Sequence, residues 1–149
     1  MEERDAAIGG EARIGERSAS SVIRSYEDLD VYKTSYQAML TIFRHILPII
    51  PKEEKFDLTD QIRRSCKAIP RLIAEGHSKR HQVRGFQKYV DDAHAEANET
   101  IVSLNQVKDL YASATNHALI IKLIDQYDKI SRQLYNLSKA WMSFSKDRR

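Results

Sequence analysis

Residues 58–76 read LTDQIRRSCKAIPRLIAEG, and this stretch carries the strongest structural signal in the chain. Its apolar side chains recur every three or four residues, the spacing that gathers side chains on one face of an α-helix. They are Leu58, Ile62, Cys66, Ile69 and Ile73. At about 100° per residue, the last three fall within roughly 40° of Ile62. The bases of this stretch, Arg63, Arg64, Lys67 and Arg71, fall at roughly 100° to 200° from Ile62. The pattern predicts a helix with an apolar inner face and a basic outer face.

Residues at both ends of this stretch are typical of helix boundaries. Asp57 is a candidate N-cap, and Asp60 is a favourable acid for the first turn. Gly76 is the expected stop. Pro70 lies inside the pattern, where it removes a backbone donor and clashes with the preceding turn, so we expect a kink there.

Three further amphipathic segments surround this helix. The first begins after the candidate cap Ser25 and ends near Pro48 and Pro51. The next begins after Ser78 and continues to about residue 111, and the last begins after Asn116. Four long helices with short connections and no strand pattern predict an all-α, antiparallel up-down four-helix bundle over residues 25–144.

The two ends of the chain lack apolar periodicity. Residues 1–24 mix acids and arginines with Gly9, Gly10, Gly15 and a run of small residues. Because so little apolar surface cannot offset the entropy of ordering, we expect residues 1–24 to form a flexible, disordered tail. Residues 145–149 are expected to form a short basic tail.

Composition sets broad limits on the class of protein. The chain has 149 residues, with 42% hydrophobic and 30% charged residues, which suits one globular domain. Cys66 is the single cysteine, so no internal disulfide is expected, and this suits a reducing cytosol. No run approaches the ~18 apolar residues of a membrane span, and the N-terminus lacks the apolar segment of a signal peptide. We therefore expect a cytoplasmic protein without a membrane partner.

Charge is segregated along the chain. Residues 61–90 hold eight bases against one acid, Glu75, a net charge of +7. Residues 1–60 hold eight bases and twelve acids, and residues 91–149 hold eight of each. The eight bases are Arg63, Arg64, Lys67, Arg71, Lys79, Arg80, Arg84 and Lys88. A concentrated basic surface attracts polyanions through phosphate contacts and counterion release. These eight residues are the candidate nucleic-acid-binding site, for RNA or DNA.

The predicted turn between the second and third helices spans only about three residues, Gly76 to Ser78. It makes the two helices antiparallel neighbours, so Lys67 and Arg71 should come close to Lys79, Arg80 and Arg84. On the third helix, Arg80, Arg84 and Lys88 are spaced to share one face. Two other interpretations stay open: the bases form a merely solvated face, or they bind a protein partner that has an acidic surface.

The sequence holds only fragments of known catalytic and metal-site patterns. His94-Ala95-Glu96 matches half of a zinc deaminase signature, but no downstream P-C-x-x-C follows. His77 and His81 are two histidines next to the basic residues without the third ligand that zinc needs. No Glu is followed three residues later by His, as di-iron bundles require.

Cys66 falls in the apolar stripe, which favours a buried structural thiol. Most tyrosines also fall on apolar stripes, which favours core packing over base stacking. The sequence predicts no catalytic residue, no metal site and no cofactor, and hence no enzyme.

Several stretches resemble one bacterial four-helix bundle family. Residues 26–32, YEDLDVY, resemble its opening F-x-D-L-x-V-W, and residues 51–58, PKEEKFDL, resemble its turn P-x-x-E-x-F-x-L. Residues 61–76 resemble its hallmark Q-I-R-R-A-x-x-S-I-P-x-N-I-A-E-G, with Leu72 in place of the asparagine. Ala93 and Glu99 fit its later A-x-G-S-x-x-E, in which Ala95-Glu96 replace the Gly-Ser pair. The family comprises proteins encoded by intervening sequences of 23S rRNA genes and accessory variability proteins of diversity-generating retroelements.

This resemblance covers roughly residues 26–142 and implies more than the residue patterns do. It implies a ring-like homo-oligomer, with a pentamer favoured. In the retroelement branch it implies a basic barrel that binds nucleic acid and the retroelement reverse transcriptase, with Arg63, Arg64, Lys67 and Arg71 as candidate contacts. The resulting hypothesis is an accessory subunit of that reverse transcriptase, which binds template RNA or cDNA. The alternative is a structural or protein-interaction module of the 23S rRNA intervening-sequence type without a nucleic-acid role.

Overall fold

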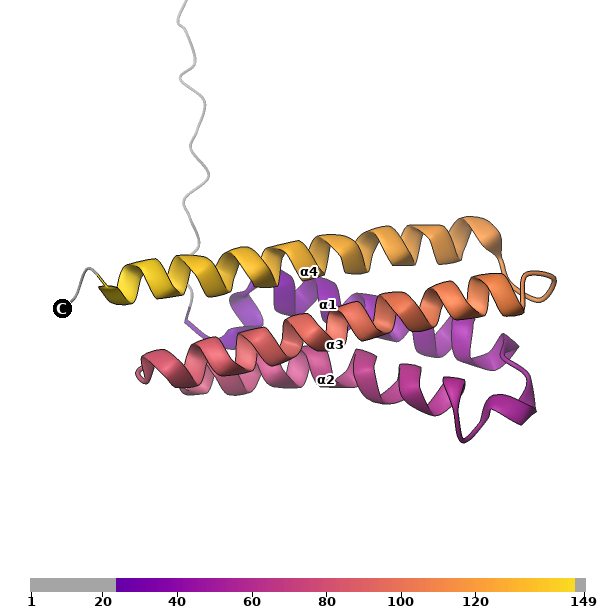
Figure 1. The fold of residues 1–149 in the computed structure, drawn as a ribbon, viewed down its shortest axis with the longest axis horizontal. Helices are drawn as coiled ribbons and strands as arrows, with labels where there is room; N and C mark the ends of the chain where they lie inside the picture. Colours follow the sequence, from indigo (N-terminus) through magenta and orange to yellow (C-terminus); the bar gives the residue numbers. More distant parts are fainter. Residues whose placement is uncertain (1–23, 147–149) are drawn as a thin grey trace, which may run out of the picture.

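The structure is a computed structural model that describes residues 24–146, with side chains up to residue 143. It consists of four long helices that alternate in direction (Figure 1). The helices are α1 (Asp30–Thr41), α2 (Leu58–Ser78), α3 (Val83–Leu110) and α4 (His117–Lys146). α1 packs on α2 and α4, and α3 packs on the same two helices from the other side. The predicted four-helix bundle is confirmed. The predicted tails, 1–24 and 145–149, lie outside the described residues except for Arg24 and residues 145 and 146.

A short 3-10 helix precedes α1. Ser25 is an N-cap, as predicted, but it caps the short helix η1 (Tyr26–Asp28) rather than α1. Its hydroxyl accepts a hydrogen bond from Glu27 N at 3.2 Å, and Asp28 Oδ2 accepts one from Ser25 N at 3.1 Å. Asp28 Oδ2 also accepts a hydrogen bond from Arg24 N at 2.8 Å, and the backbone hydrogen bonds from Arg24 and then from Ser25 favour the ionised carboxylate and lower the pKa of Asp28. Leu29 then adopts an extended backbone, so the α-helix begins only at Asp30.

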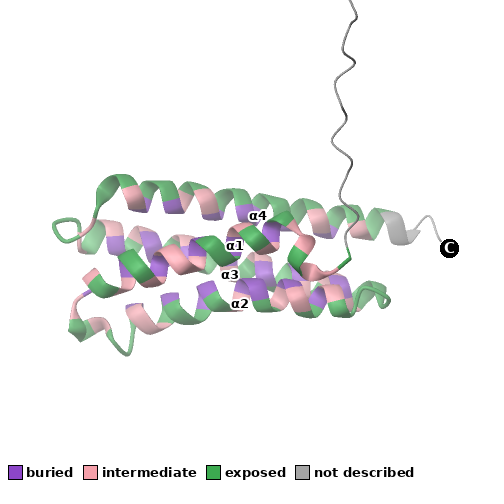
Figure 2. Cartoon of the chain, turned by 180° about the vertical axis from the view of Figure 1, so that it is seen from behind, coloured by how far each residue is buried: buried purple, intermediate pink, exposed green. Residues whose placement is uncertain are grey.

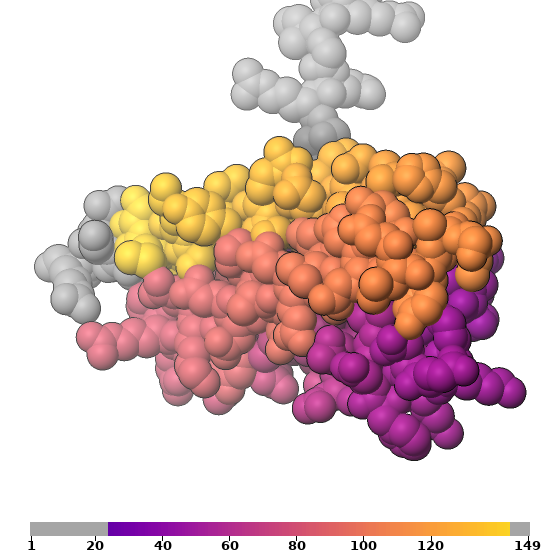
Figure 3. Space-filling view, turned by 45° about the vertical axis from the view of Figure 1, so that its right-hand side comes forward, coloured from indigo at the N-terminus to yellow at the C-terminus, as the bar shows by residue number. Residues whose placement is uncertain are grey.

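The chain between α1 and α2 runs through short helical turns. α1 continues as a π-helical segment, η2 (Ile42–Ile46), and then as the 3-10 turns η3 (Leu47–Ile49) and η4 (Lys52–Glu54). The helical run passes through Pro48 within η3 and ends at Ile49, so it stops between the two prolines at which its end was predicted. This segment forms the protruding end of the molecule, drawn in purple in Figure 3.

Glu54 links the start of α2 to the end of α3. Asp57 occupies the N-cap position, as predicted, but its side chain makes no capping hydrogen bond. Instead, Glu54 Oε2 accepts a hydrogen bond from Leu58 N at 3.2 Å, and Glu54 Oε1 accepts one from the Tyr111 hydroxyl at 2.6 Å. The bond to Glu54 is the main cause of the raised pKa of Tyr111. The Glu54 carboxylate therefore caps α2 and also connects it to Tyr111, 57 residues later in the sequence.

The α2–α3 junction differs from the prediction. α2 continues past Gly76 to Ser78, whose hydroxyl donates to the Ala74 carbonyl at 3.1 Å instead of capping α3. α3 begins at Val83 with Gln82 as its N-cap residue, so the turn spans residues 79–82. Gly76 is buried against α3, where an added Cβ would lie 3.1 Å from Tyr89 Cβ. The glycine thus permits close approach of two helices, and it does not end one.

The core lies between the inner faces of the four helices, shown in purple in Figure 2. The predicted stripe of α2 is confirmed, since all five of its residues are buried. Buried hydroxyls cross the interfaces: Thr100 donates to Ser65 at 2.8 Å, between α3 and α2, and Ser138 of α4 donates to Asp91 at 2.6 Å. Pro70 is buried inside α2, and the helix continues through it. The predicted kink stays a prediction.

Replacing Gly76 by alanine tests the close approach of α2 and α3. Helix propensity alone would stabilise the variant by about 1 kcal/mol. Tyr89 Cβ belongs to a packed helix and cannot rotate away, and overpacking typically costs about 1–3 kcal/mol. We expect Gly76→Ala to lower the free energy of unfolding by about 1 kcal/mol net, measured by urea denaturation.

Gly85→Ala is the matched control. Its added Cβ would meet Gln82 Cβ and Oε1 at 3.3 Å and Lys79 Cβ at 3.4 Å, but Oε1 can rotate away and both residues belong to the exposed turn, whose backbone can shift by a few tenths of an ångström. This variant should gain up to about 1 kcal/mol from helix propensity. If Gly76→Ala gained stability to the same extent, the tight helix contact would be contradicted.

Candidate nucleic-acid interface

All eight predicted basic residues are exposed, but they lie on three different elements. Arg63, Arg64, Lys67 and Arg71 project from α2, Arg84 and Lys88 project from α3, and Lys79 and Arg80 lie in the turn. The prediction that Arg80 shares a helix face with Arg84 and Lys88 is therefore wrong, because α3 begins only at Val83. The longer α2 and the four-residue turn place Arg80 outside both helices.

The bases of α2 divide between two hollows. On the α1 side, Lys67 and Arg71 line a hollow of about 370 Å³, and the Arg63 guanidinium lies 5.5 Å from the centre of the Phe43 ring. On the α3 side, Arg64 and Arg71 line a hollow of about 410 Å³. Arg71 borders both hollows. Together, Arg63, Arg64, Lys67 and Arg71 form the basic ridge of α2.

A second group of cations gathers at the α2–α3 turn. The Lys79 ammonium lies 3.1 Å from the Tyr89 hydroxyl and 5.0 Å from the ring centre, and the Lys88 ammonium lies 5.4 Å from the same ring centre. Arg80 donates to the His77 carbonyl at 2.8 Å. The structure therefore brings Lys79 and Lys88 to one aromatic ring, across the junction that the sequence predicts to be basic.

Few of these cations are neutralised by acids. Arg64 pairs with Asp60 at 3.7 Å and Lys88 with Asp92 at 4.0 Å, both on exposed helix surfaces. Such exposed pairs contribute about 0–1 kcal/mol, so water or an anion replaces them readily. Within residues 24–146, the other six have no ion-pair partner. They are Arg63, Lys67, Arg71, Lys79, Arg80 and Arg84.

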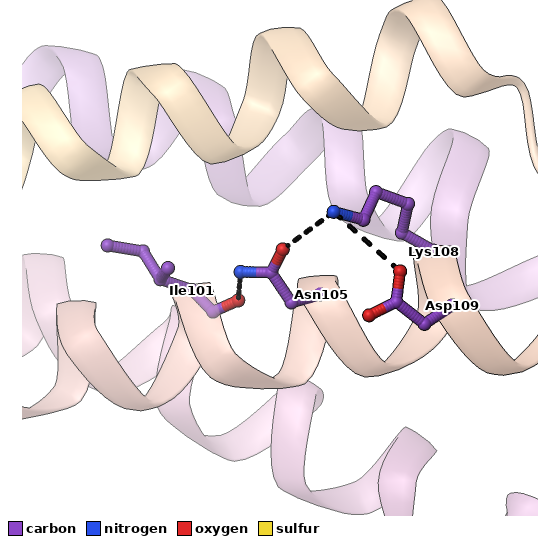
Figure 4. Close-up of polar contacts among 4 residues, drawn as sticks. All are labelled: Ile101, Asn105, Lys108 and Asp109. Carbon is purple, nitrogen blue, oxygen red and sulfur yellow. Dashed lines mark hydrogen bonds and ion pairs between the residues drawn. The ribbon is translucent and has the colours of Figure 1, made fainter.

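Lys108 of α3 shows the contrasting arrangement (Figure 4). Its ammonium donates to Asn105 Oδ1 at 3.0 Å and lies 3.7 Å from the Asp109 carboxylate. Asn105 is held in turn by a hydrogen bond of 3.0 Å to the Ile101 carbonyl. This lysine is only partly exposed and pairs with an acid within its own helix, whereas the cations of α2 and of the turn are exposed and, except for Arg64, have no ion-pair partner among the described residues.

Acids distinguish the two hollows beside α2. Glu96 and Glu99 of α3 line the hollow that contains Arg64, whereas no acid is among the residues that line the α1-side hollow. Burial, and then the neighbouring Glu99 charge, raise the pKa of Glu96. Carboxylates repel phosphates, so the α1-side hollow is the more favourable place for a polyanion. The sequence did not show this asymmetry, because Glu96 and Glu99 lie about thirty residues from Arg64.

His77 contributes little positive charge to the site. It lies in the last turn of α2, where burial, and then the positive charge of Arg80, lower the pKa of its imidazole. The ring is therefore mostly neutral at pH 7. His81 lies exposed in the turn.

Cys66 lies in the core and not in a reactive site. Its side chain is fully buried, and burial raises the pKa of the thiol to about 12. Since the thiolate is the nucleophile, the neutral buried thiol is inert. Among the described residues, no three His, Cys, Asp or Glu side chains gather to hold a metal ion. None of the helices described is long and apolar enough to cross a membrane.

The sequence interpretation favoured core packing for most tyrosines, but some of them are at least partly exposed. Tyr127 is fully buried, whereas Tyr36 is 41% exposed and Tyr32 is half-buried. Tyr32 and Tyr36 line the α1-side hollow together with Tyr26 of η1. The signal that could have identified them is their spacing: residues 32 and 36 share a helix face that need not be the core face.

The geometry defines a four-helix protein with a mostly unpaired basic ridge. The family model of the 23S rRNA-intervening sequence protein matches residues 27–136, and the chain belongs to this family. A search of curated proteins and a search of solved structures found no match. The family resemblance predicted from the sequence is thereby confirmed.

The raised pKa of Cys66 predicts a pH-dependent stability. In the unfolded chain the thiol ionises near pH 8.5, whereas the folded state keeps it neutral up to about pH 12. Stability from this group is complete below about pH 8.5 and is lost as pH rises. Between about pH 8 and pH 10 the native protein should lose roughly 1–2 kcal/mol more unfolding free energy than Cys66→Ala does. If urea denaturation showed that the native protein and Cys66→Ala lose the same unfolding free energy over this pH range, the prediction would be contradicted.

Proposed function

We propose that the protein is a non-enzymatic nucleic-acid-binding homo-oligomer of the cytoplasm. In its most specific form, the proposal is an accessory subunit of a diversity-generating retroelement reverse transcriptase, which binds template RNA or cDNA together with that enzyme. The family match supports the four-helix fold on which this proposal is built. The retroelement role is what the sequence resemblance implies. The DNA or RNA contacts rest on the basic ridge of α2 and on the basic turn.

One observation carries the proposal: six of the eight basic residues are exposed and have no ion-pair partner among the described residues. Unpaired cations at this density are costly to hold near one another unless an anion or counterions neutralise them. A nucleic acid does so by replacing condensed counterions with Lys and Arg contacts, which releases the counterions.

The expected mode of binding is electrostatic and largely independent of sequence. Phosphate contacts position a nucleic acid but do not read its bases. Arg63 and Arg71 offer forked guanidinium donors that match phosphate oxygens, and Lys67 lies between them as a point charge. Lys79 and Lys88 at the Tyr89 ring offer two further cations at the turn. A strand laid along α2 could follow these contacts in order.

Exposed apolar side chains support the oligomeric part of the proposal. Phe56 is 88% exposed, Leu110 is 65% exposed and Val102 is 57% exposed. Phe56 and Leu110 lie at the same end of the bundle, where Tyr111 bonds to Glu54. Apolar groups gathered in this way are typical of surfaces that contact another protein. We propose that this end contacts a neighbouring copy, in a ring for which a pentamer is favoured.

A charge reversal on α2 tests the nucleic-acid role. Arg63→Glu combined with Arg71→Glu replaces two phosphate contacts by repulsion on the side of α2 that carries no acid in its hollow. We expect RNA affinity in a low-salt gel shift to fall by at least tenfold, since each lost contact and each added repulsion reduces the counterion release.

Lys122→Glu with Lys129→Glu is the matched control, because it makes the same change in net charge on an exposed surface of α4. This variant should lose little affinity. A gel shift that the α2 pair leaves unchanged, or that both pairs weaken equally, would contradict a role for the ridge.

The oligomer is tested by sedimentation. The native chain should sediment with the mass of several chains, five being favoured, and Phe56→Ser should shift it toward a single chain because the apolar contact is lost. Val83→Ser removes an apolar side chain that is 43% exposed at the other end of α3, and should leave the mass unchanged. A native protein that sediments as one chain would contradict the assembly.

The second candidate function is a protein-interaction module without a nucleic-acid role. Phe56 is the observation that favours it, since a phenylalanine exposed at 88% suits a protein contact of any kind. This candidate predicts that a copurified partner is captured through Phe56 even after nuclease treatment, and that the α2 charge reversal leaves capture intact.

A further inference from the structure

Three tyrosines face the cations of α2 across the α1-side hollow. Tyr26 comes from η1, and Tyr32 and Tyr36 come from α1. Lys67 and Arg71 line the opposite wall on α2. The hollow is open to solvent and has a volume of about 370 Å³, within the range of about 300–1,000 Å³ that is usual for small-molecule sites. Three aromatic rings and two cations therefore line one hollow that is large enough for a small ligand.

The local backbone explains why the rings meet. Leu29 is extended between η1 and α1, so the chain turns there and η1 packs against α2 (Figure 2). The Tyr26 ring therefore packs against the Tyr32 ring, with ring centres 5.0 Å apart in an edge-to-face arrangement. Tyr36 follows one helical turn later, with its ring centre 5.9 Å from that of Tyr32. The three rings form a continuous aromatic wall.

Tyr36 forms the accessible end of this wall. It is 41% exposed, whereas Tyr32 is half-buried between its two neighbours. Tyr32 and Tyr36 also line a second hollow of about 260 Å³, together with Lys33 and Glu27. The Tyr36 ring thus borders two hollows, of which only the α1-side hollow has cations and no acid in its lining.

We infer that the α1-side hollow receives an unpaired base of a single-stranded nucleic acid, stacked on Tyr36, with Lys67 and Arg71 on the adjoining phosphates. This inference rests on the proposed function and adds to it the form of nucleic acid that is bound. It requires aromatic and basic groups on facing walls, and the hollow supplies both.

The chemistry of the walls favours a single strand over other polyanions. In a duplex both faces of each base are covered by its neighbours, so no base can enter a hollow without unpairing. In a single strand the bases are free to stack on aromatic side chains, and such stacking tolerates any sequence. An acidic peptide would contact the two cations equally well, but it would leave the apolar rings without a partner.

The test uses the full-length protein and two fluorescent probes of equal length, a single-stranded RNA and an RNA duplex, titrated at low salt. Tyr36→Ser should weaken single-strand binding roughly tenfold, the change expected for one lost base–aromatic stack. Duplex binding, which depends on phosphates alone, should stay within twofold. Tyr36→Phe keeps the ring and should bind like the native protein.

Tyr135→Ser is the matched control. Tyr135 is 52% exposed on α4, with the Lys139 ammonium 5.2 Å from its ring centre, so it is an exposed tyrosine beside a lysine but outside the hollow. Its replacement should change neither affinity. If Tyr135→Ser and Tyr36→Ser weakened single-strand binding alike, the assignment to this hollow would be overturned.

The remaining outcomes separate this inference from the proposed function. If the native protein binds both probes and Tyr36→Ser binds both equally well, nucleic-acid binding stands and base stacking is overturned. If the native protein binds neither probe, the proposed function fails and the inference fails with it. If polyglutamate binds as tightly as the single strand and with the same dependence on Tyr36, the hollow is a site for acidic peptide.

Discussion

The cost of burying a charge dictates how α2 presents its surface. Ile62, Ile69 and Ile73 enter the core and remove their apolar surface from water. The Arg and Lys side chains between them in sequence stay in water, because burying an unpaired ion costs far more free energy than burying an isoleucine gains. One helical period therefore creates the core and the basic ridge together. Any change that rotated α2 would expose isoleucines and bury guanidinium groups, so the orientation of the ridge is as stable as the fold itself.

The neighbours of α2 turn this ridge into an asymmetric surface. On one side, Glu96 and Glu99 of α3 face Arg64 and oppose a bound phosphate. On the other side, α1 and η1 contribute tyrosines and no acid to the lining of the hollow. The same bundle that buries the core thus separates a repulsive groove from an attractive one. For the nucleic acid that we propose, the electrostatics of the two hollows favours the α1 side of α2, and the aromatic wall favours a single strand.

The sequence predicts most of the fold, because helical periodicity and caps are local signals. Asn116 caps α4, with its side chain accepting from Leu119 N at 3.1 Å, as its position before an apolar run indicates. Gly76 misled the prediction, because a glycine that ends a helix and one that permits a close helix crossing look alike in sequence. The same limit applies to the site. The exposure of each cation follows from periodicity, whereas the acids opposite Arg64 and the tyrosines opposite Lys67 depend on tertiary packing.

The dependence of RNA affinity on salt is the most direct measurement of this basic surface. If the six cations without ion-pair partners each contact one phosphate of a single strand, the logarithm of the binding constant should fall with the logarithm of salt concentration with a slope of about −4, or roughly −0.7 per contact. A steep slope of this size is the predicted result. A slope near zero, with affinity unchanged between low and physiological salt, would show that the cations of α2 and of the turn do not hold phosphates.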